Sequence, residues 1–131
     1  MALFRKTLEQ SLSLASKDRV DEAVSKLEEG IKEAIEAKDP KWASLLSKNA
    51  ALICEQKGDL DAARHYYQVS LRYDRPDPYL HFALAILYQR LGKTRSSRRY
   101  FNSCYELVRR TKNKDLLAML ERSGYKKRGK A

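Results

Sequence analysis

Arginine and lysine side chains form the part of this 131-residue chain whose types and spacing are best suited to chemistry. The arginines recur at helical intervals along residues 95–110, so they fall on one side of a helix, and the basic charge continues into Lys112 and Lys114. Guanidinium groups bind phosphate and carboxylate through forked hydrogen bonds, and a cluster of this density predicts an anion-binding surface. The predicted anion-binding residues are Arg95, Arg98, Arg99, Arg109, Arg110, Lys112 and Lys114.

The net charge of +10 is concentrated in the last third of the chain. Residues 1–87 hold 13 Lys and Arg against 14 Asp and Glu, whereas residues 88–131 hold 14 against 3. This asymmetry predicts a nucleic acid, another polyanion or an acidic protein as a partner of the basic third. A solvated helix face followed by a disordered basic tail at 125–131 accounts for the same charge, and the sequence leaves both interpretations open.

No set of residues in the sequence calls for catalysis. The chain has two histidines, and His65 lies four positions after Asp61 without an evident nucleophile or metal partner. His81 occupies a packing position, and neither a glycine-rich phosphate loop nor an H-E-x-x-H motif is present. We therefore predict a protein that is not an enzyme, with no catalytic residues, no metal site and no cofactor.

The cysteine pattern and the hydropathy predict a soluble, cytoplasmic protein. Cys54 and Cys104 lie among apolar residues without metal-binding or redox spacing, so we interpret both as small buried side chains rather than as a disulfide. The first 20 residues lack the apolar core of a signal peptide. No stretch approaches the roughly 18 apolar residues that a membrane span requires.

Apolar periodicity and capping signals predict an all-α fold. Apolar residues recur at i, i+3, i+4 and i+7, and strict alternation appears nowhere over a useful length. Asp39 and Asp77 each precede a proline, the pattern of a helix start, and Asp115 is placed to cap a last short helix. The glycines are interpreted as turns and helix ends. The predicted helices cover residues 2–16, 19–37, 40–57, 60–73, 78–91, 94–111 and 115–122.

A repeat with an offset of 34 residues relates residues 58–67 to residues 92–101. In each copy a glycine is followed five positions later by a small residue and four positions after that by an aromatic one. This pattern resembles the tetratricopeptide repeat (TPR) family, over roughly residues 4–111. The resemblance implies a single domain over residues 1–124, an α-α superhelix of three helical hairpins with a C-terminal capping helix. The hairpins would cover residues 2–37, 40–73 and 78–111.

The same resemblance implies an adaptor or scaffold that binds a protein or peptide. Arrays of this family bind peptides along a concave groove lined by the first helix of each hairpin, and an apolar groove suits an amphipathic helix or an extended segment. An equally open interpretation is that some of these side chains are core residues. The predicted groove residues are Leu8, Leu12, Leu45, Lys48, Asn49, Leu52, Tyr79, Phe82, Ile86, Gln89 and Arg90.

The family pattern raises two further interactions, a carboxylate clamp and self-association. Some members grip a C-terminal carboxylate with a basic clamp, but Leu8 and Leu12 stand where that clamp needs polar side chains, and Tyr79 replaces a later basic one. The resemblance therefore implies no such clamp here. Open arrays expose end faces that can stack, so self-association stays a third alternative.

Overall fold

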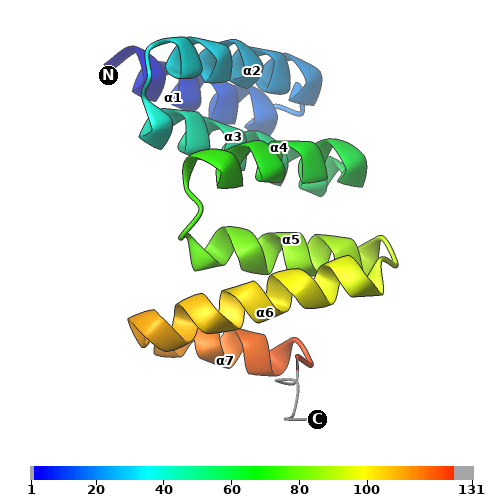
Figure 1. The fold of residues 1–131 in the computed structure, drawn as a ribbon. Helices are drawn as coiled ribbons and strands as arrows, with labels where there is room; N and C mark the ends of the chain where they lie inside the picture. The colour runs from blue at the N-terminus through cyan, green and yellow to red at the C-terminus, as the bar shows by residue number, and fades with distance from the viewer. Residues whose placement is uncertain (1, 126–131) are drawn as a thin grey trace. The chain divides into compact units, whose positions relative to one another are not determined.

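The computed structural model describes residues 2–125, and over these residues the chain forms seven helices and no strand (Figure 1). The helices are α1 (Ala2–Ser16), α2 (Val20–Glu36), α3 (Pro40–Lys57), α4 (Leu60–Tyr73), α5 (Pro78–Arg90), α6 (Thr94–Thr111) and α7 (Lys114–Arg122). The all-α prediction is confirmed, and every predicted boundary lies within one residue of the observed one.

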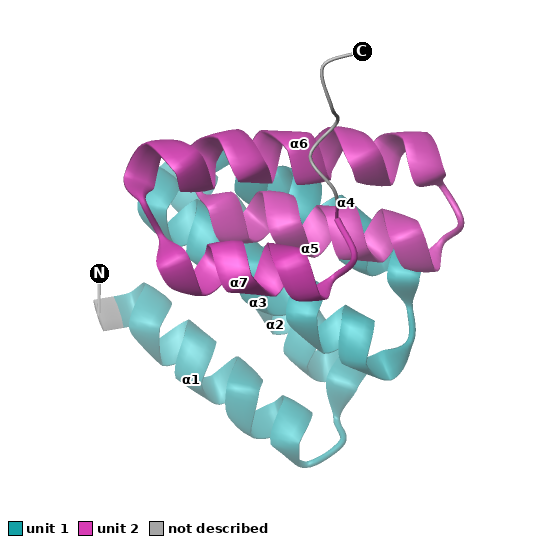
Figure 2. Cartoon of the chain, turned by 90° about the horizontal axis from the view of Figure 1, so that it is seen from below, with its two compact units in different colours: residues 1–75 teal, residues 76–131 magenta. Residues whose placement is uncertain are grey.

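The chain divides into two compact units, Met1–Arg75 and Pro76–Ala131 (Figure 2). We call them the N-terminal unit and the C-terminal unit. The first contains the helical hairpins α1–α2 and α3–α4, and the second contains the hairpin α5–α6 followed by α7. The single domain over residues 1–124 stays a prediction, and residues 126–131 of the predicted tail lie outside the described residues.

Side-chain caps explain why several helices begin where they do. The Asp39 carboxylate accepts a hydrogen bond from the Trp42 backbone N–H at 3.2 Å, and that of Asp77 accepts from the Tyr79 N–H at 2.9 Å. Each cap satisfies a backbone donor that the first helical turn leaves without a partner. The prediction for α7 was wrong. Its capping residue is Asn113, whose amide oxygen accepts from the backbone of Leu116 at 3.0 Å, and the predicted Asp115 lies within the first turn.

In the N-terminal unit, α3 and α4 are joined by buried hydrogen bonds as well as by apolar packing. The Ser44 hydroxyl lies 3.0 Å from the Ser70 carbonyl oxygen, and the Ser70 hydroxyl lies 2.8 Å from the Ser44 carbonyl oxygen. Tyr67, the aromatic residue of the repeat, is buried, and its hydroxyl donates to the Glu55 carboxylate at 2.9 Å. Burial, together with this hydrogen bond, raises the pKa of the Tyr67 hydroxyl.

Gly30 allows close packing of three helices and departs from the predicted use of glycine at helix ends. It lies in the interior of α2 and is buried. A Cβ atom at this position would stand 3.0 Å from the Thr7 Cγ2 methyl and 3.1 Å from the Leu46 Cδ1 methyl. The glycine therefore lets α2 lie close to α1 and α3, at the cost of about 1 kcal/mol in helix propensity relative to alanine.

In the C-terminal unit, the three helices share one apolar core. Its fully or almost fully buried members are Ala85, Phe101, Cys104, Val108, Leu116 and Leu120. Because α7 contributes two of them, it covers apolar surface of the preceding hairpin, the role predicted for a capping helix.

Tyr125 corrects the predicted start of the tail. Its ring centroid lies 5.5 Å from that of Phe101 and 6.0 Å from that of Tyr105, and its hydroxyl donates to the Asn102 side-chain oxygen at 2.7 Å. Tyr125 is therefore part of the packed unit, because an aromatic ring gains more from this half-buried site than from solvent.

Candidate interaction surfaces

The first helices of the N-terminal unit, α1 and α3, carry most of the exposed apolar surface of that unit. Leu12 on α1 is 43% exposed, and Leu45 and Leu52 on α3 are 38% and 41% exposed. All three were predicted as groove residues, and Leu8 beside them is half-buried. Isolated leucines on a surface are ordinary, but three on the two first helices of one unit offer several apolar side chains to a partner. We call Leu8, Leu12, Leu45 and Leu52 the leucine face.

Two polar groove residues lie within this face. Lys48 and Asn49 are both half-buried. The Asn49 side-chain N–H donates to the Leu45 backbone carbonyl one turn earlier, at 2.8 Å. This bond holds the Asn49 amide along its own helix, next to Leu45.

Leu3 is an exposed apolar residue that the sequence interpretation missed. It lies on α1 and is the most exposed of the large apolar side chains in the described chain. The family resemblance begins at about residue 4, so the repeat pattern offered no position for it. The start of the apolar spacing on α1 is the signal that would have found it.

The predicted groove residues of the C-terminal unit have mixed surroundings on α5. Tyr79 is 43% exposed, and its hydroxyl accepts a hydrogen bond from the Asn113 amide at 3.3 Å. Phe82 and Ile86 are half-buried and pack against the shared core of α5, α6 and α7, with the Phe82 and Phe101 rings 6.1 Å apart. The core interpretation therefore fits these two residues better. Gln89 and Arg90 are exposed at the end of the helix.

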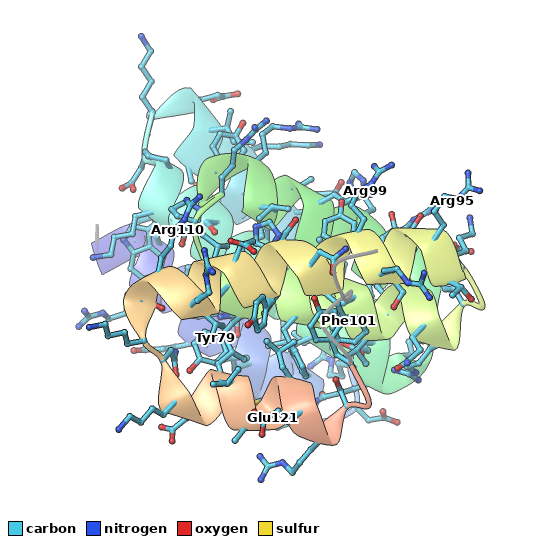
Figure 3. All side chains as sticks on the ribbon, turned by 60° about the horizontal axis from the view of Figure 1, so that its bottom comes forward. Tyr79, Arg95, Arg99, Phe101, Arg110 and Glu121 are labelled. Atoms are coloured by element: carbon cyan, nitrogen blue, oxygen red, sulfur yellow. The ribbon has the colours of Figure 1, made fainter. Side chains whose placement is uncertain are left out.

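The basic side chains of α6 lie opposite its buried side. Figure 3 shows Arg95, Arg99 and Arg110 along one side of α6 and Phe101 on the other. The predicted arginines on this helix are all exposed, whereas the buried residues are Ser97, Phe101, Cys104 and Val108. Arg109 lies 3.7 Å from the Glu106 carboxylate, a surface pair of little energetic weight. This division of the helix is confirmed, and anion binding by it stays a prediction.

The two cysteines are buried, and Asp61 lies near a cation of its own helix. Cys54 and Cys104 are free and buried, and burial raises the pKa of the Cys104 thiol to about 12, so it is not a thiolate nucleophile near neutral pH. Asp61, the residue weighed as a partner of His65, lies 3.7 Å from Arg64. Among residues 2–125, no group of three or more His, Cys, Asp or Glu side chains is placed to hold a metal ion.

Over residues 2–125, no helix is both long enough and apolar enough to cross a bilayer.

Comparison with known proteins identifies the repeat. The sequence model of the family named Tetratricopeptide repeat matches residues 49–77, which contain the second half of α3 and all of α4. The TPR domain of Arabidopsis FLU superposes with a TM-score of 0.69 at 13% identity, over 81% of this chain and 94% of that one. PilF of Pseudomonas aeruginosa superposes with a TM-score of 0.65 at 20% identity, over 89% of this chain and 57% of that one. A MamA mutant superposes with a TM-score of 0.50 at 14% identity, over 79% of this chain and 96% of that one.

These matches confirm the predicted resemblance. Residues 49–77 form a tetratricopeptide repeat, and the fold is that of TPR domains. The chain spans little more than half of the PilF structure. No curated protein sequence gives a significant match.

Proposed function

We propose that this chain is a non-catalytic adaptor or scaffold that binds a peptide or a helix of a partner protein along its first helices. One observation carries the proposal. Of the six large apolar side chains exposed in the described chain, five lie on α1, α3 and α5, and only Ile35 lies on a second helix. Second helices bury their apolar residues within the array, whereas first helices keep apolar surface available to a partner.

The expected occupant is an apolar segment that covers the leucine face. An amphipathic helix with apolar anchors at i, i+3 and i+7, or an extended segment with alternating anchors, matches such a surface. Full burial of a leucine is worth about 1.5–3 kcal/mol, so covering the exposed two-fifths of Leu52 contributes about 0.6–1.2 kcal/mol. Each exposed leucine is therefore worth about a three- to eightfold change in affinity. We also propose that the protein acts in the cytoplasm, as the sequence predicts.

Affinity capture from nuclease-treated lysate tests the proposal, with a matched control inside the same unit. The test variant is Leu52→Glu on α3, and the control is Ile35→Glu on α2, because the two side chains are 41% and 39% exposed. Both variants introduce the same charge at nearly the same exposure, so we expect similar and small effects on folding. The proposal expects the Leu52 variant to lose defined protein partners that the Ile35 variant keeps. Equal capture by both variants and by the wild type would sink it.

A second candidate function is association with nucleic acid or another polyanion through the basic side of α6. The observation that favours it is the exposure of all five arginines of that helix. Each neutralised phosphate releases a counterion, so binding of a polyanion must weaken steeply as salt rises. Capture that disappears with nuclease, and that is lost when Arg95, Arg98 and Arg99 become Glu, would favour this function over the leucine face.

A further inference from the structure

The turn between α6 and α7 closes a pocket that is separate from the leucine face and lies wholly in the C-terminal unit. Its volume is about 300 Å³. Seven residues line it: Tyr105, Val108, Arg109, Lys112, Asn113, Lys114 and Leu117. This volume is at the lower end of the range for ligand sites, roughly 300–1,000 Å³, so it suits one bulky side chain.

The pocket has apolar walls and a basic rim. Val108 is buried, and Tyr105 and Leu117 are half-buried members of the same core packing. Arg109 and Lys114 are exposed at the mouth, and so is Lys112 between them. A ligand that fits must therefore present an apolar group to the walls and negative charge to the rim.

The one amide side chain of the lining is already engaged. The Asn113 amide oxygen accepts from the Leu116 backbone N–H at 3.0 Å, and its N–H donates to the Tyr79 hydroxyl at 3.3 Å. A nucleobase placed here would bury polar edges against walls that are mainly apolar, which is costly. A hydrocarbon side chain has no such groups to satisfy, so the lining favours a peptide over a nucleic acid.

The turn fixes the shape of the pocket from both sides. α6 ends with Lys112 in the left-handed conformation, at φ 55°, and the backbone N–H of Asn113 bonds back to the Val108 carbonyl at 3.4 Å. Asn113 then caps α7. Because both ends of this short turn are tied to helices, the backbone positions of the three basic residues beside the pocket are fixed.

We propose that this pocket binds an acidic peptide segment of a partner protein. One large apolar side chain of the segment enters the pocket, and carboxylates on either side of it meet Arg109, Lys112 and Lys114. The site differs from a general polyanion surface because it requires the apolar side chain as well as the charge. It does not rest on the leucine face, and its failure would leave that proposal untouched.

A peptide titration followed by NMR on the 15N-labelled full chain tests this site. The probe is a capped five-residue peptide with a central phenylalanine flanked by two glutamates on each side. We expect amide shifts concentrated at residues 105–117, and at least tenfold weaker binding when the phenylalanine is replaced by alanine or the glutamates by glutamine. Equal binding of the phenylalanine and alanine peptides, or no binding at millimolar peptide, would overturn the proposal.

Two charge-reversal pairs on the protein separate the pocket from general electrostatics. The first pair, Arg109→Glu with Lys114→Glu, reverses two charges at the rim of the pocket. The control pair, Arg95→Glu with Arg99→Glu, makes the same charge change at the other end of α6. The proposal expects at least a tenfold loss of peptide affinity for the rim pair and less than threefold for the control pair. Equal losses would contradict it. So would a ten-nucleotide single-stranded RNA that binds more tightly than the peptide and depends on the rim pair, which would assign the pocket to nucleic acid.

Lys112→Gly distinguishes a binding role from a structural one. Glycine adopts a positive φ without steric cost, so the variant should keep or raise the unfolding midpoint. The removed cation should still weaken peptide binding by about threefold or more. An unchanged affinity would remove Lys112 from the site.

Discussion

A double-mutant cycle at Ser44 and Ser70 tests how closely α3 and α4 are packed in the N-terminal unit. Ser70 is fully buried and Ser44 is 6% exposed. Their two hydroxyl oxygens lie 2.9 Å apart, and each hydroxyl also lies within 3.0 Å of the other residue's carbonyl oxygen. Either hydroxyl therefore keeps an acceptor when the other is removed.

This geometry predicts nearly additive effects. Ser44→Ala and Ser70→Ala each remove one hydrogen bond, worth about 1 kcal/mol, and the better helix propensity of alanine offsets a few tenths of that. Each single variant should lose about 0.5–1 kcal/mol, and the double variant about 1–2 kcal/mol. The Ser70 carbonyl stays bonded to the Asp74 N–H at 3.1 Å, so no buried acceptor is left without a partner. The coupling energy should be below about 0.5 kcal/mol, although residues in contact often couple more strongly.

Urea unfolding followed by Trp42 fluorescence provides the assay. Trp42 is the one tryptophan of the sequence and lies on α3, so it reports on the unit that contains both serines. The reasoning would be refuted by a double variant more stable than either single one. That result would mean that the hydroxyls bond only to each other, and that each single variant leaves an unsatisfied hydroxyl.

Three further predictions concern packing and ionisation. Gly30→Val should destabilise the N-terminal unit by about 1–3 kcal/mol, because its methyl groups must displace Thr7 and Leu46, and an unchanged urea midpoint would show that the helices are not so close. The Cys104 thiol should stay unreactive toward a disulfide reagent at pH 8 until urea is added, and rapid labelling of the native chain would contradict its burial. Because burial raises the pKa of that thiol from 9.0 to about 12, its contribution to stability is constant below pH 9 and falls at higher pH, so the wild type should lose more stability than Cys104→Ala between pH 8 and 11.

The helix boundaries were predictable because the sequence marks them with local chemistry. Asp39 and Asp77 each precede a proline, and that pair of residues fixes a helix start without help from tertiary contacts. Asn113 and Asp115 both offer side-chain oxygens near the start of α7, and the choice between them depends on the backbone path after Lys112. Only the structure shows that path.

Other features depended on contacts between helices that no local pattern contains. Gly30 falls inside the predicted helix over residues 19–37, but its role is set by methyl groups of Thr7 and Leu46 on neighbouring helices. Phe82 matches the family's binding face, yet in this chain it packs toward Phe101. The basic side of α6 was predictable because its arginines follow helical periodicity. The adjoining pocket was not, because it depends on how α7 packs against α6.

The leucine face is tested most directly by methyl NMR of the chain with a partner obtained by affinity capture. Leucine and isoleucine methyl groups are labelled, and purified partner is added. The account predicts that the methyl signals of Leu12, Leu45 and Leu52 shift or broaden, while that of Ile35, equally exposed on α2, does not. Shifts confined to Ile35, or to the C-terminal unit with none at the three leucines, would contradict it.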